Sequence, residues 1–300
     1  MSGTLLITGA SGLVGRALVA QLLAARHPLR LVSRTPERIP AAAGTSAIGW
    51  DGCTLGAAAV DGADAIVHLA GEPIFGGRPT RARRARIWTS RIDSTRSLVQ
   101  RISELPASAR PRTLLCASAV GFYGDRGEEE LREDSAPGRG FLAELCVAWE
   151  EEARRAEQLG LRVVQLRFGV VLSRAGGALP VLVRAFRLGL GGRIGSGRQW
   201  FSWVQLDDAV ALALRALEDA RLSGPLNVVA PEPVRNADFT RALARALRRP
   251  ALLAAPAFAV RLALRELSVE LLGSRQVLPA RAQALGHRFA FPDLPSALAT

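Results

Sequence analysis

The sequence is 300 residues long, 49% hydrophobic and 22% charged, which is long and apolar enough for one large or two modest domains with a substantial core. It contains no lysine, so arginine alone supplies the 39 basic residues, and with 27 acidic residues the formal net charge is +12. We expect no membrane span, because no segment approaches about 18 uninterrupted apolar residues, and no signal peptide, because the N-terminus leads directly into a predicted strand.

Residues 5–15 predict a short buried strand, a glycine turn and the start of an apolar helix. Glycines recur at positions 9, 12 and 15, which permits a tight turn, close approach of a pyrophosphate and close packing of helix on strand. The helix N-terminus adds free N–H groups and a partial positive charge. The pattern therefore favours a dinucleotide site over a plain structural turn. The residues predicted to bind the cofactor here are Gly9, Ser11, Gly12, Leu13 and Val14.

The second predicted strand, residues 29–32, ends in Ser33 and Arg34, about 20 residues beyond the glycine turn. An acidic residue at this strand end would accept the ribose hydroxyls of NAD. A hydroxyl and a guanidinium instead suit a 2′-phosphate, so we predict NADP rather than NAD. The alternative is that Arg34 is simply a solvated loop arginine.

Residues 47–51 predict a short third strand, and residues 65–71 a clearer buried strand that runs into a glycine turn. His68 lies in this apolar run, which favours a hydrogen-bonded core histidine over a catalytic one. Residues 81–91 carry five arginines and lead into a helix. Most of these arginines are expected on a solvated face, with one or two able to reach a phosphate.

The fifth predicted strand is 112–119, and a charged surface loop is expected over 125–140. Residues 141–159 predict a helix with a buried stripe at Phe141, Leu145 and Trp149, after which three glutamates at 150–152 begin a solvated part. The apolar run 161–172 predicts a sixth strand covered on both faces. This alternation of strands and helices predicts an α/β fold with a doubly wound parallel sheet.

After residue 173 the sequence becomes glycine-rich and then aromatic at 200–203, and residues 226–229 resemble a last strand. We predict an NADP-binding domain at 1–172, to which roughly 205–230 returns, and a smaller substrate-side domain within 173–300. Asp207 and Asp208 are expected to cap a helix at 209–217 rather than to act in catalysis. The aromatic segment is a candidate wall for a substrate pocket.

The glycine turn, residues 68–71 and residues 118–124 resemble an extended short-chain dehydrogenase/reductase of the epimerase/dehydratase type, with a Rossmann sheet. Further segments narrow the resemblance to an atypical subgroup, the epimerase-like proteins often labelled SulA-type cell-division inhibitors. These segments are 69–72, 149–150, 186–192, 194–197, 201–204 and 278–279. The resemblance covers nearly the whole chain and implies an NADP-binding domain, a small C-terminal domain and no securely assigned substrate.

The resemblance also implies further cofactor contacts outside the glycine turn. Besides Ser33 and Arg34 at the 2′-phosphate, the implied contacts are Leu69, Ala70, Gly71, Arg91 and Val171. A family contact would also fall at Arg86, where the residue type departs from the family pattern.

The usual catalytic group of the superfamily, Ser with Tyr-x-x-x-Lys, cannot be built from this chain. The sequence has no lysine and a single tyrosine, Tyr123. Where Tyr-x-x-x-Lys should open a helix, the chain has Phe141 and Leu145 instead. Ser118 remains as a candidate hydrogen-bond donor to a substrate oxygen, and Tyr123 is either a substitute acid or part of the pocket wall.

Two functions remain open on these grounds: an NADP-dependent oxidoreductase or epimerase-like enzyme acting on an unidentified small molecule, and a catalytically silent NADP-binding regulatory or redox-sensing protein. The scattered arginines predict no nucleic-acid partner. Three cysteines without C-x-x-C spacing suit a reducing, cytoplasmic compartment, and the lack of clustered ligands predicts no metal site. The oligomeric state is not predictable from the sequence.

Overall fold

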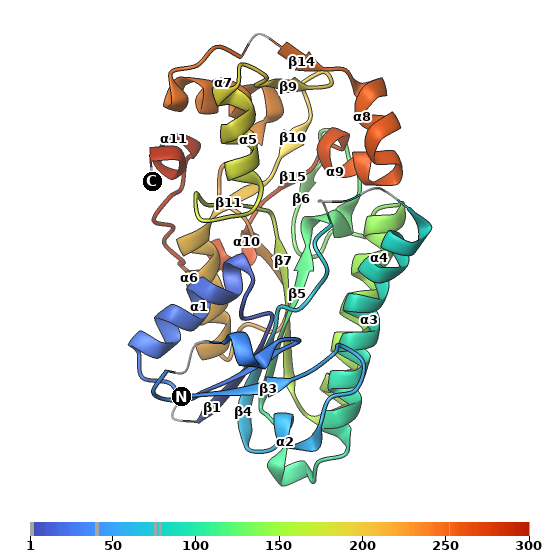
Figure 1. Ribbon diagram of the computed structural model, residues 1–300, viewed down its shortest axis with the longest axis vertical. Coiled ribbons are helices and arrows are strands. Elements are labelled where there is room, and N and C mark those ends of the chain that lie inside the picture. The colour runs from blue at the N-terminus through green and yellow to red at the C-terminus, as the bar shows by residue number, and fades with distance from the viewer. Residues whose placement is uncertain (1–2, 40–41, 75–76, 78–79, 252, 300) are drawn as a thin grey trace. The chain divides into compact units, whose positions relative to one another are not determined.

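The computed structural model of the protein describes residues 3–39, 42–74, 77, 80–251 and 253–299 (Figure 1). The chain forms two compact units. Unit 1 comprises Met1–Ser118, Val147–Leu166 and Ala213–Pro225, and unit 2 comprises Ala119–Cys146, Arg167–Leu212 and Leu226–Thr300. The domain boundary that the sequence suggests at residue 172 stays a prediction.

A seven-stranded sheet forms the centre of the fold, in the order β12-β7-β5-β4-β1-β2-β3. Its strands are β1 (Thr4–Thr8), β2 (Leu29–Ser33), β3 (Thr45–Gly49), β4 (Ala63–His68), β5 (Thr113–Ala119), β7 (Arg162–Phe168) and β12 (Gly224–Val228). The pairings that join β5, β4, β1, β2 and β3 are all parallel. The strand order reverses beside β1, which is the topological switch point of a doubly wound sheet. The predicted α/β fold class is confirmed.

The central strands are mostly apolar, as expected where helices cover both faces of a parallel sheet. Leu5, Leu6 and Ile7 of β1 are completely buried. In Figure 1, α1 (Leu13–Ala24) and α3 (Arg81–Ser103) lie on opposite sides of the sheet. Helix α3 begins at Arg81, earlier than the sequence suggests, so the arginine-rich segment is itself helical. The smaller elements of unit 1 are α2 (Ala57–Val60) and the 3₁₀ turns η1 (Pro36–Arg38), η2 (Ala107–Ala109) and η4 (Arg155–Leu159).

Two elements belong partly to each unit, α4 (Phe141–Arg154) and α6 (Leu206–Glu218). The predicted buried stripe of α4 is confirmed, since Phe141, Leu145 and Trp149 are at most 8% exposed. The expectation that residues 150–152 are solvated was wrong for two of the three, because Glu150 and Glu152 are each 5% exposed.

The predicted sixth strand is divided at Gly169 into β7 and β8 (Val170–Leu172). A Cβ on Gly169 would lie 2.9 Å from the carbonyl oxygen of Ser202, so only glycine allows this close approach. Beyond the division, β8 leaves the central sheet and pairs in parallel with β11 (Trp203–Gln205).

Unit 2 is built from short elements around a separate apolar cluster that includes Phe186, Trp203, Phe239 and Leu298. Its strands are β6 (Glu130–Leu131), β9 (Gly192–Ile194), β10 (Trp200–Phe201), β13 (Val234–Arg235), β14 (Leu253–Ala255) and β15 (Gln276–Val277). Its helices are α5 (Ala178–Arg187), α7 (Asn236–Leu247), α8 (Ala257–Leu264), α9 (Val269–Leu272), α10 (Ala280–Ala284) and α11 (Leu294–Ala299), with 3₁₀ turns η3 (Val120–Tyr123) and η5 (Arg265–Ser268).

Two expectations about unit 2 were wrong in part, for Trp203 and for Asp208. Trp200 and Phe201 are partly exposed, so the rest of the aromatic segment stays a candidate pocket wall. Trp203 is completely buried and donates its indole N–H to the carbonyl oxygen of Glu232, so it packs in the core instead of lining a pocket. Asp208 lies inside α6 and does not cap it. Its carboxylate accepts the backbone N–H groups of Ala290 and Phe291, at 2.8 and 2.9 Å, and so fixes the C-terminal tail. None of the described helices combines the length and apolarity needed to cross a membrane.

Candidate functional site

The glycine turn after β1 is tightly packed. Gly9 has a φ of +71°, which favours glycine, and a Cβ there would lie 2.6 Å from the carbonyl carbon of Leu69 and 2.8 Å from the nitrogen of Ala70. The N–H of Gly12 donates to the carbonyl oxygen of Gly9 at 2.9 Å. A Cβ on Gly15 would overlap that same oxygen. Gly9 and Gly15 are therefore needed for this turn.

The N-terminus of α1 is open above this turn. Gly12 is the N-cap, no side chain caps the helix, and the first turn carries no acidic residue. Ser11 and Gly12 are exposed, and Leu13 and Val14 are half-buried. The first backbone N–H groups of a helix have no partner within the helix, so this end offers donors and a partial positive charge to an anion.

The end of β2 lies beside the end of β1, since Val32 pairs with Thr8. The hydroxyl of Ser33 accepts the backbone N–H of Thr35 at 3.1 Å. Arg34 is exposed, and no ion pair holds its guanidinium within the described part of the chain. A hydroxyl and a solvated guanidinium thus stand together at the strand end adjacent to the glycine turn.

The end of β4 flanks the glycine turn on its other side. The backbone N–H of Ala70 donates to the Thr8 hydroxyl at 3.2 Å, and that hydroxyl also bonds Nδ1 of His68 at 2.7 Å. His68 is completely buried, and burial lowers its pKa to about 4. The prediction that His68 is a hydrogen-bonded core residue is confirmed.

Arg91 lies next to Gly71 at this same edge. A Cβ on Gly71 would come within 3.2 Å of the guanidinium carbon of Arg91, which also lies 5.2 Å from the centre of the Trp149 ring. Its Nη1 donates to the carbonyl oxygen of Ile87 at 3.1 Å, and the residue is only 8% exposed. Arg83 is also buried, whereas Arg81, Arg84 and Arg86 lie on the exposed face of α3 as expected.

Unit 1 therefore brings most of the predicted cofactor residues to one edge of the sheet. The turn at 9–14 lies against Leu69 and Ala70, with Ser33 and Arg34 on the neighbouring strand end and Arg91 beside Gly71. Val171 belongs to unit 2, where it lies on β8 opposite Val204 of β11. Its assignment to the cofactor stays a prediction.

Ser118, near the end of β5, has a partner that the sequence did not suggest. Its hydroxyl donates to the Glu150 carboxylate at 2.6 Å, and the serine is 3% exposed. The preceding residue, Trp149, donates its indole N–H to the Thr95 hydroxyl at 3.0 Å. Two adjacent residues of α4 thus fix this helix to β5 and to α3. A glutamate within a run of three acids carries no sequence signal for such a role.

Tyr123 ends the 3₁₀ turn η3 in unit 2, and its side chain is completely buried. Its hydroxyl donates to Oδ1 of Asn227 at 2.7 Å and accepts Nη1 of Arg167 at 2.9 Å. Burial raises the pKa of Tyr123 to about 12, although Arg167 acts in the opposite direction. The phenol is therefore a weak acid that is already bonded on both sides.

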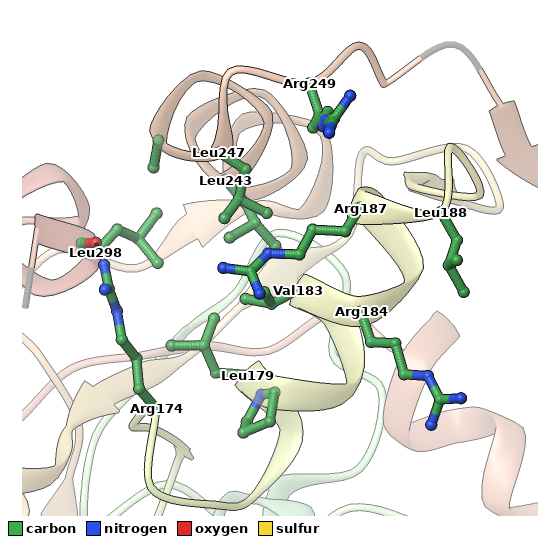
Figure 2. Close-up of a pocket in the computed structure, with 12 residues that line it drawn as sticks. Arg174, Leu179, Val183, Arg184, Arg187, Leu188, Leu243, Leu247, Arg249 and Leu298 are labelled. Atoms are coloured by element: carbon green, nitrogen blue, oxygen red, sulfur yellow. Dashed lines mark hydrogen bonds between the residues drawn. The ribbon is translucent and has the colours of Figure 1, made fainter.

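A cavity of about 810 Å³ lies in unit 2 between α5, α7 and the C-terminal segment. Figure 2 shows Arg187 extending across the space between α5 and α7, with Arg174 directed toward Leu298. Leu179 of α5 and Leu243 of α7 are among the apolar residues that line the cavity. None of the predicted site residues lines it. Among the residues that the structure describes, no group of three histidine, cysteine or acidic side chains is placed to hold a metal ion.

The parallel sheet and the open β1–α1 corner define a Rossmann-type α/β protein. More particularly, the chain belongs to the NAD dependent epimerase/dehydratase family, whose model matches residues 5–229. Residues 255–300 match a domain of unknown function, DUF1731.

The curated relative and the human structure described next match over nearly their whole length. The chain is 41% identical over 296 residues to epimerase family protein Mb2239 of Mycobacterium bovis, covering 97% of this chain and 95% of that one. A crystal structure of human epimerase family protein SDR39U1 (isoform 2) with NADPH superposes with a TM-score of 0.87 at 34% identity, covering 99% of this chain and 98% of that one. A UDP-glucuronic acid 4-epimerase of Bacillus cereus, 17% identical with a TM-score of 0.78 over 99% of this chain and 94% of that one, shares the fold.

Proposed function

We propose that the protein is an NADP-dependent oxidoreductase or epimerase-like enzyme acting on a small molecule. The main observation behind this proposal is the glycine turn, where the exposed start of α1 lies next to the Leu69–Ala70 backbone that packs against Gly9. The human relative bound to NADPH supports the same cofactor here.

The residues present fit this cofactor. A Cβ at Gly9 or Gly15 would collide with backbone atoms, so the turn carries no side chain at these two positions. The backbone N–H groups at the start of α1 are therefore accessible to a pyrophosphate. Gly12, Leu13 and Val14 would hold the pyrophosphate, and Ser33 with Arg34 the 2′-phosphate. Leu69 to Gly71, with Arg91 and Val171, would lie along the rest of the nucleotide. When bound, the cofactor supplies or accepts a hydride.

Replacing Arg34 with alanine tests the assignment to NADP. Losing a hydrogen bond to a charged group costs about 1.5–3 kcal/mol, so we expect calorimetry to show NADPH binding weakened roughly 10- to 100-fold. NADH affinity should change little, because it has no 2′-phosphate. Arg38→Ala, which removes another exposed arginine four residues further along the chain, is the matched control. Equal losses for the two nucleotides would show that Arg34 does not read the 2′-phosphate.

The second candidate function is a catalytically silent NADP-binding protein. It is favoured because both candidate catalytic hydroxyls are buried and hydrogen-bonded to other side chains. Ser118 is committed to Glu150, and Tyr123 to Asn227 and Arg167. The complete burial of the Tyr123 side chain argues against an acid role and equally against a wall role. A panel of carbonyls, alcohols and nucleotide sugars with NADPH or NADP⁺ separates the candidates. Hydride transfer with any member supports the enzyme, and tight cofactor binding without any turnover supports the silent protein.

A further inference from the structure

The cavity of about 810 Å³ between α5, α7 and the C-terminal segment lies entirely within unit 2. None of the residues proposed to bind the nucleotide lines it. Of the twelve described residues that do, four are arginines, the other eight are apolar, and none is acidic. The cavity therefore combines apolar walls with positive charge of a single sign.

One face of α5 supplies both properties. Leu179, Val183 and Arg187 follow one another at intervals of four residues, so they lie on the same face of the helix. Leu179 and, across the cavity on α7, Leu243 are 4% and 2% exposed, and Val183 packs against the apolar cluster to which both belong. The apolar wall is thus an extension of the core of unit 2, and it leads directly to the Arg187 guanidinium.

The arginines of the cavity are available to a ligand. Figure 2 shows Arg187 extended over the cavity, Arg174 on the side of Leu298, and Arg184 pointing away from both. Nη2 of Arg174 donates to the carbonyl oxygen of Leu298 at 3.3 Å, which holds this guanidinium at the cavity. Arg187 and Arg249 are exposed, and neither has a hydrogen bond or ion pair with the described residues. Both stay protonated at physiological pH.

Other arginines of unit 2 are neutralised by acids, as Arg235 is by Glu128 and Arg275 is by Glu270. The cavity lacks such partners among the residues that the structure describes, so its like charges repel one another until an anion enters. Guanidinium groups bind phosphate and carboxylate through paired hydrogen bonds. Apolar walls lower the local dielectric and strengthen that attraction.

We propose that this cavity binds an amphipathic anion, a phosphate or carboxylate group joined to an apolar chain. Arg187 and Arg174 hold the anionic group, and the chain lies against Leu179, Val183 and Leu243. The site is separate from the nucleotide edge, and the inference does not depend on hydride transfer.

Decyl phosphate, used below the concentration at which it forms micelles, is the probe. Calorimetry is carried out with saturating NADPH, so that the nucleotide site is not free to take the phosphate. We expect one molecule to bind per chain. Arg187→Gln and Arg174→Gln should each weaken binding about tenfold or more, because each removes a charged hydrogen-bond donor.

Arg245→Gln is the matched control. Arg245 and Arg187 are both exposed arginines in the last turn of a unit 2 helix, where a positive charge stabilises the helix end, but Arg245 does not line the cavity. The control should bind decyl phosphate as the wild type does. Equal thermal unfolding midpoints for Arg187→Gln and Arg245→Gln would show that any difference in binding is not a difference in folding.

Two further ligands test the two halves of the proposed chemistry. Inorganic phosphate lacks the chain and 1-decanol lacks the charge, so we expect each to bind at least tenfold more weakly than decyl phosphate. Co-sedimentation with phosphatidylcholine vesicles that contain phosphatidic acid, lost in Arg187→Gln, would assign the anion to a membrane lipid. Decyl phosphate binding without co-sedimentation would assign it to a dissolved amphiphile.

The inference is overturned if decyl phosphate does not saturate a site, or if Arg187→Gln and Arg174→Gln bind it as tightly as the wild type. Equal weakening in Arg245→Gln would also overturn it, since that result marks a response to net charge alone. Inorganic phosphate or 1-decanol binding as tightly as decyl phosphate would show that the ligand is not an amphipathic anion. None of these results bears on hydride transfer or on NADPH binding.

Discussion

At the scale of single residues, Tyr123 shows how position changes the chemistry of a side chain. The sequence allows this residue to be an acid or a wall, since a tyrosine near the end of a strand suits both. In the structure, its hydroxyl is bonded to Asn227 and Arg167 and is shut off from solvent. Burial disfavours the charged phenolate more than the neighbouring guanidinium favours it.

The ionisation of Tyr123 can be measured without interference. The chain has one tyrosine, so the ultraviolet absorbance of tyrosinate reports on Tyr123 alone. We expect its midpoint near pH 12 in the folded protein, compared with about 10 for a solvated tyrosine. Because the pKa is raised by folding, the contribution of Tyr123 to stability is complete below about pH 10 and is lost as pH rises toward 12. A midpoint near 10 in the folded state would show an accessible phenol and revive its role as an acid.

At the scale of elements, the β1–α1 corner depends on glycines that no other residue can replace. Gly15 is buried in α1, and a Cβ there would overlap the carbonyl oxygen of Gly9 and lie 2.9 Å from Cα of Ala10. The helix would have to move away from the strand to admit one methyl group. The turn whose N–H groups are proposed to bind the pyrophosphate would move with it.

We therefore expect Gly15→Ala to lower the free energy of unfolding by roughly 1–3 kcal/mol and to weaken NADPH binding. Chemical denaturation and calorimetry measure the two effects. Gly56→Ala is the matched control, because a Cβ there meets no atom within 4 Å and should change neither quantity. If Gly15→Ala behaves like Gly56→Ala, the corner is not as tightly packed as described.

The comparison of sequence with structure is also clearest at this scale. Patterns of adjacent residues predicted the strands, the glycine turn and the buried face of α4, because each depends on local periodicity. The same reasoning gave a wrong prediction for Glu150 and Glu152, because a run of three glutamates is typical of a solvated helix face. Glu152 is buried, and its carboxylate pairs at 2.7 Å with Arg96, which lies 56 residues earlier in the chain. Likewise, the partners of Asp208 and the contact of Glu270 with Gly121 join segments far apart in sequence. No local signal marks such pairs.

At the scale of the whole molecule, the charge is unusual in both size and origin. Arginine alone supplies the 39 basic residues that outnumber the 27 acidic ones and give the formal net charge of +12. Arginine stays protonated across the physiological pH range. Several of these arginines are engaged within the protein, as Arg235 is with Glu128 and Arg162 is with the carbonyl groups of Ala216, Leu217 and Leu222. The positive charge is therefore distributed and partly used in holding the fold together.

On this basis we expect no specific association with nucleic acid. The anisotropy of a labelled DNA duplex or RNA strand at near-physiological salt should not change on adding the protein. A strongly basic control protein shows that the assay responds. Binding at this salt concentration would contradict the prediction if the logarithm of the binding constant fell linearly with the logarithm of salt concentration. That dependence indicates the release of counterions from phosphates.

The place of Arg91 between Gly71 and the Trp149 ring has an optical consequence. An indole whose neighbouring cation shifts toward a bound phosphate changes its emission, and reduced nicotinamide absorbs light in the range that tryptophan emits. The protein thus carries an intrinsic fluorescent probe at its proposed nucleotide edge. Although the chain has five tryptophans, the difference between the wild type and Trp149→Phe isolates this one. Nucleotide occupancy could then be followed on the unlabelled protein before any substrate is known.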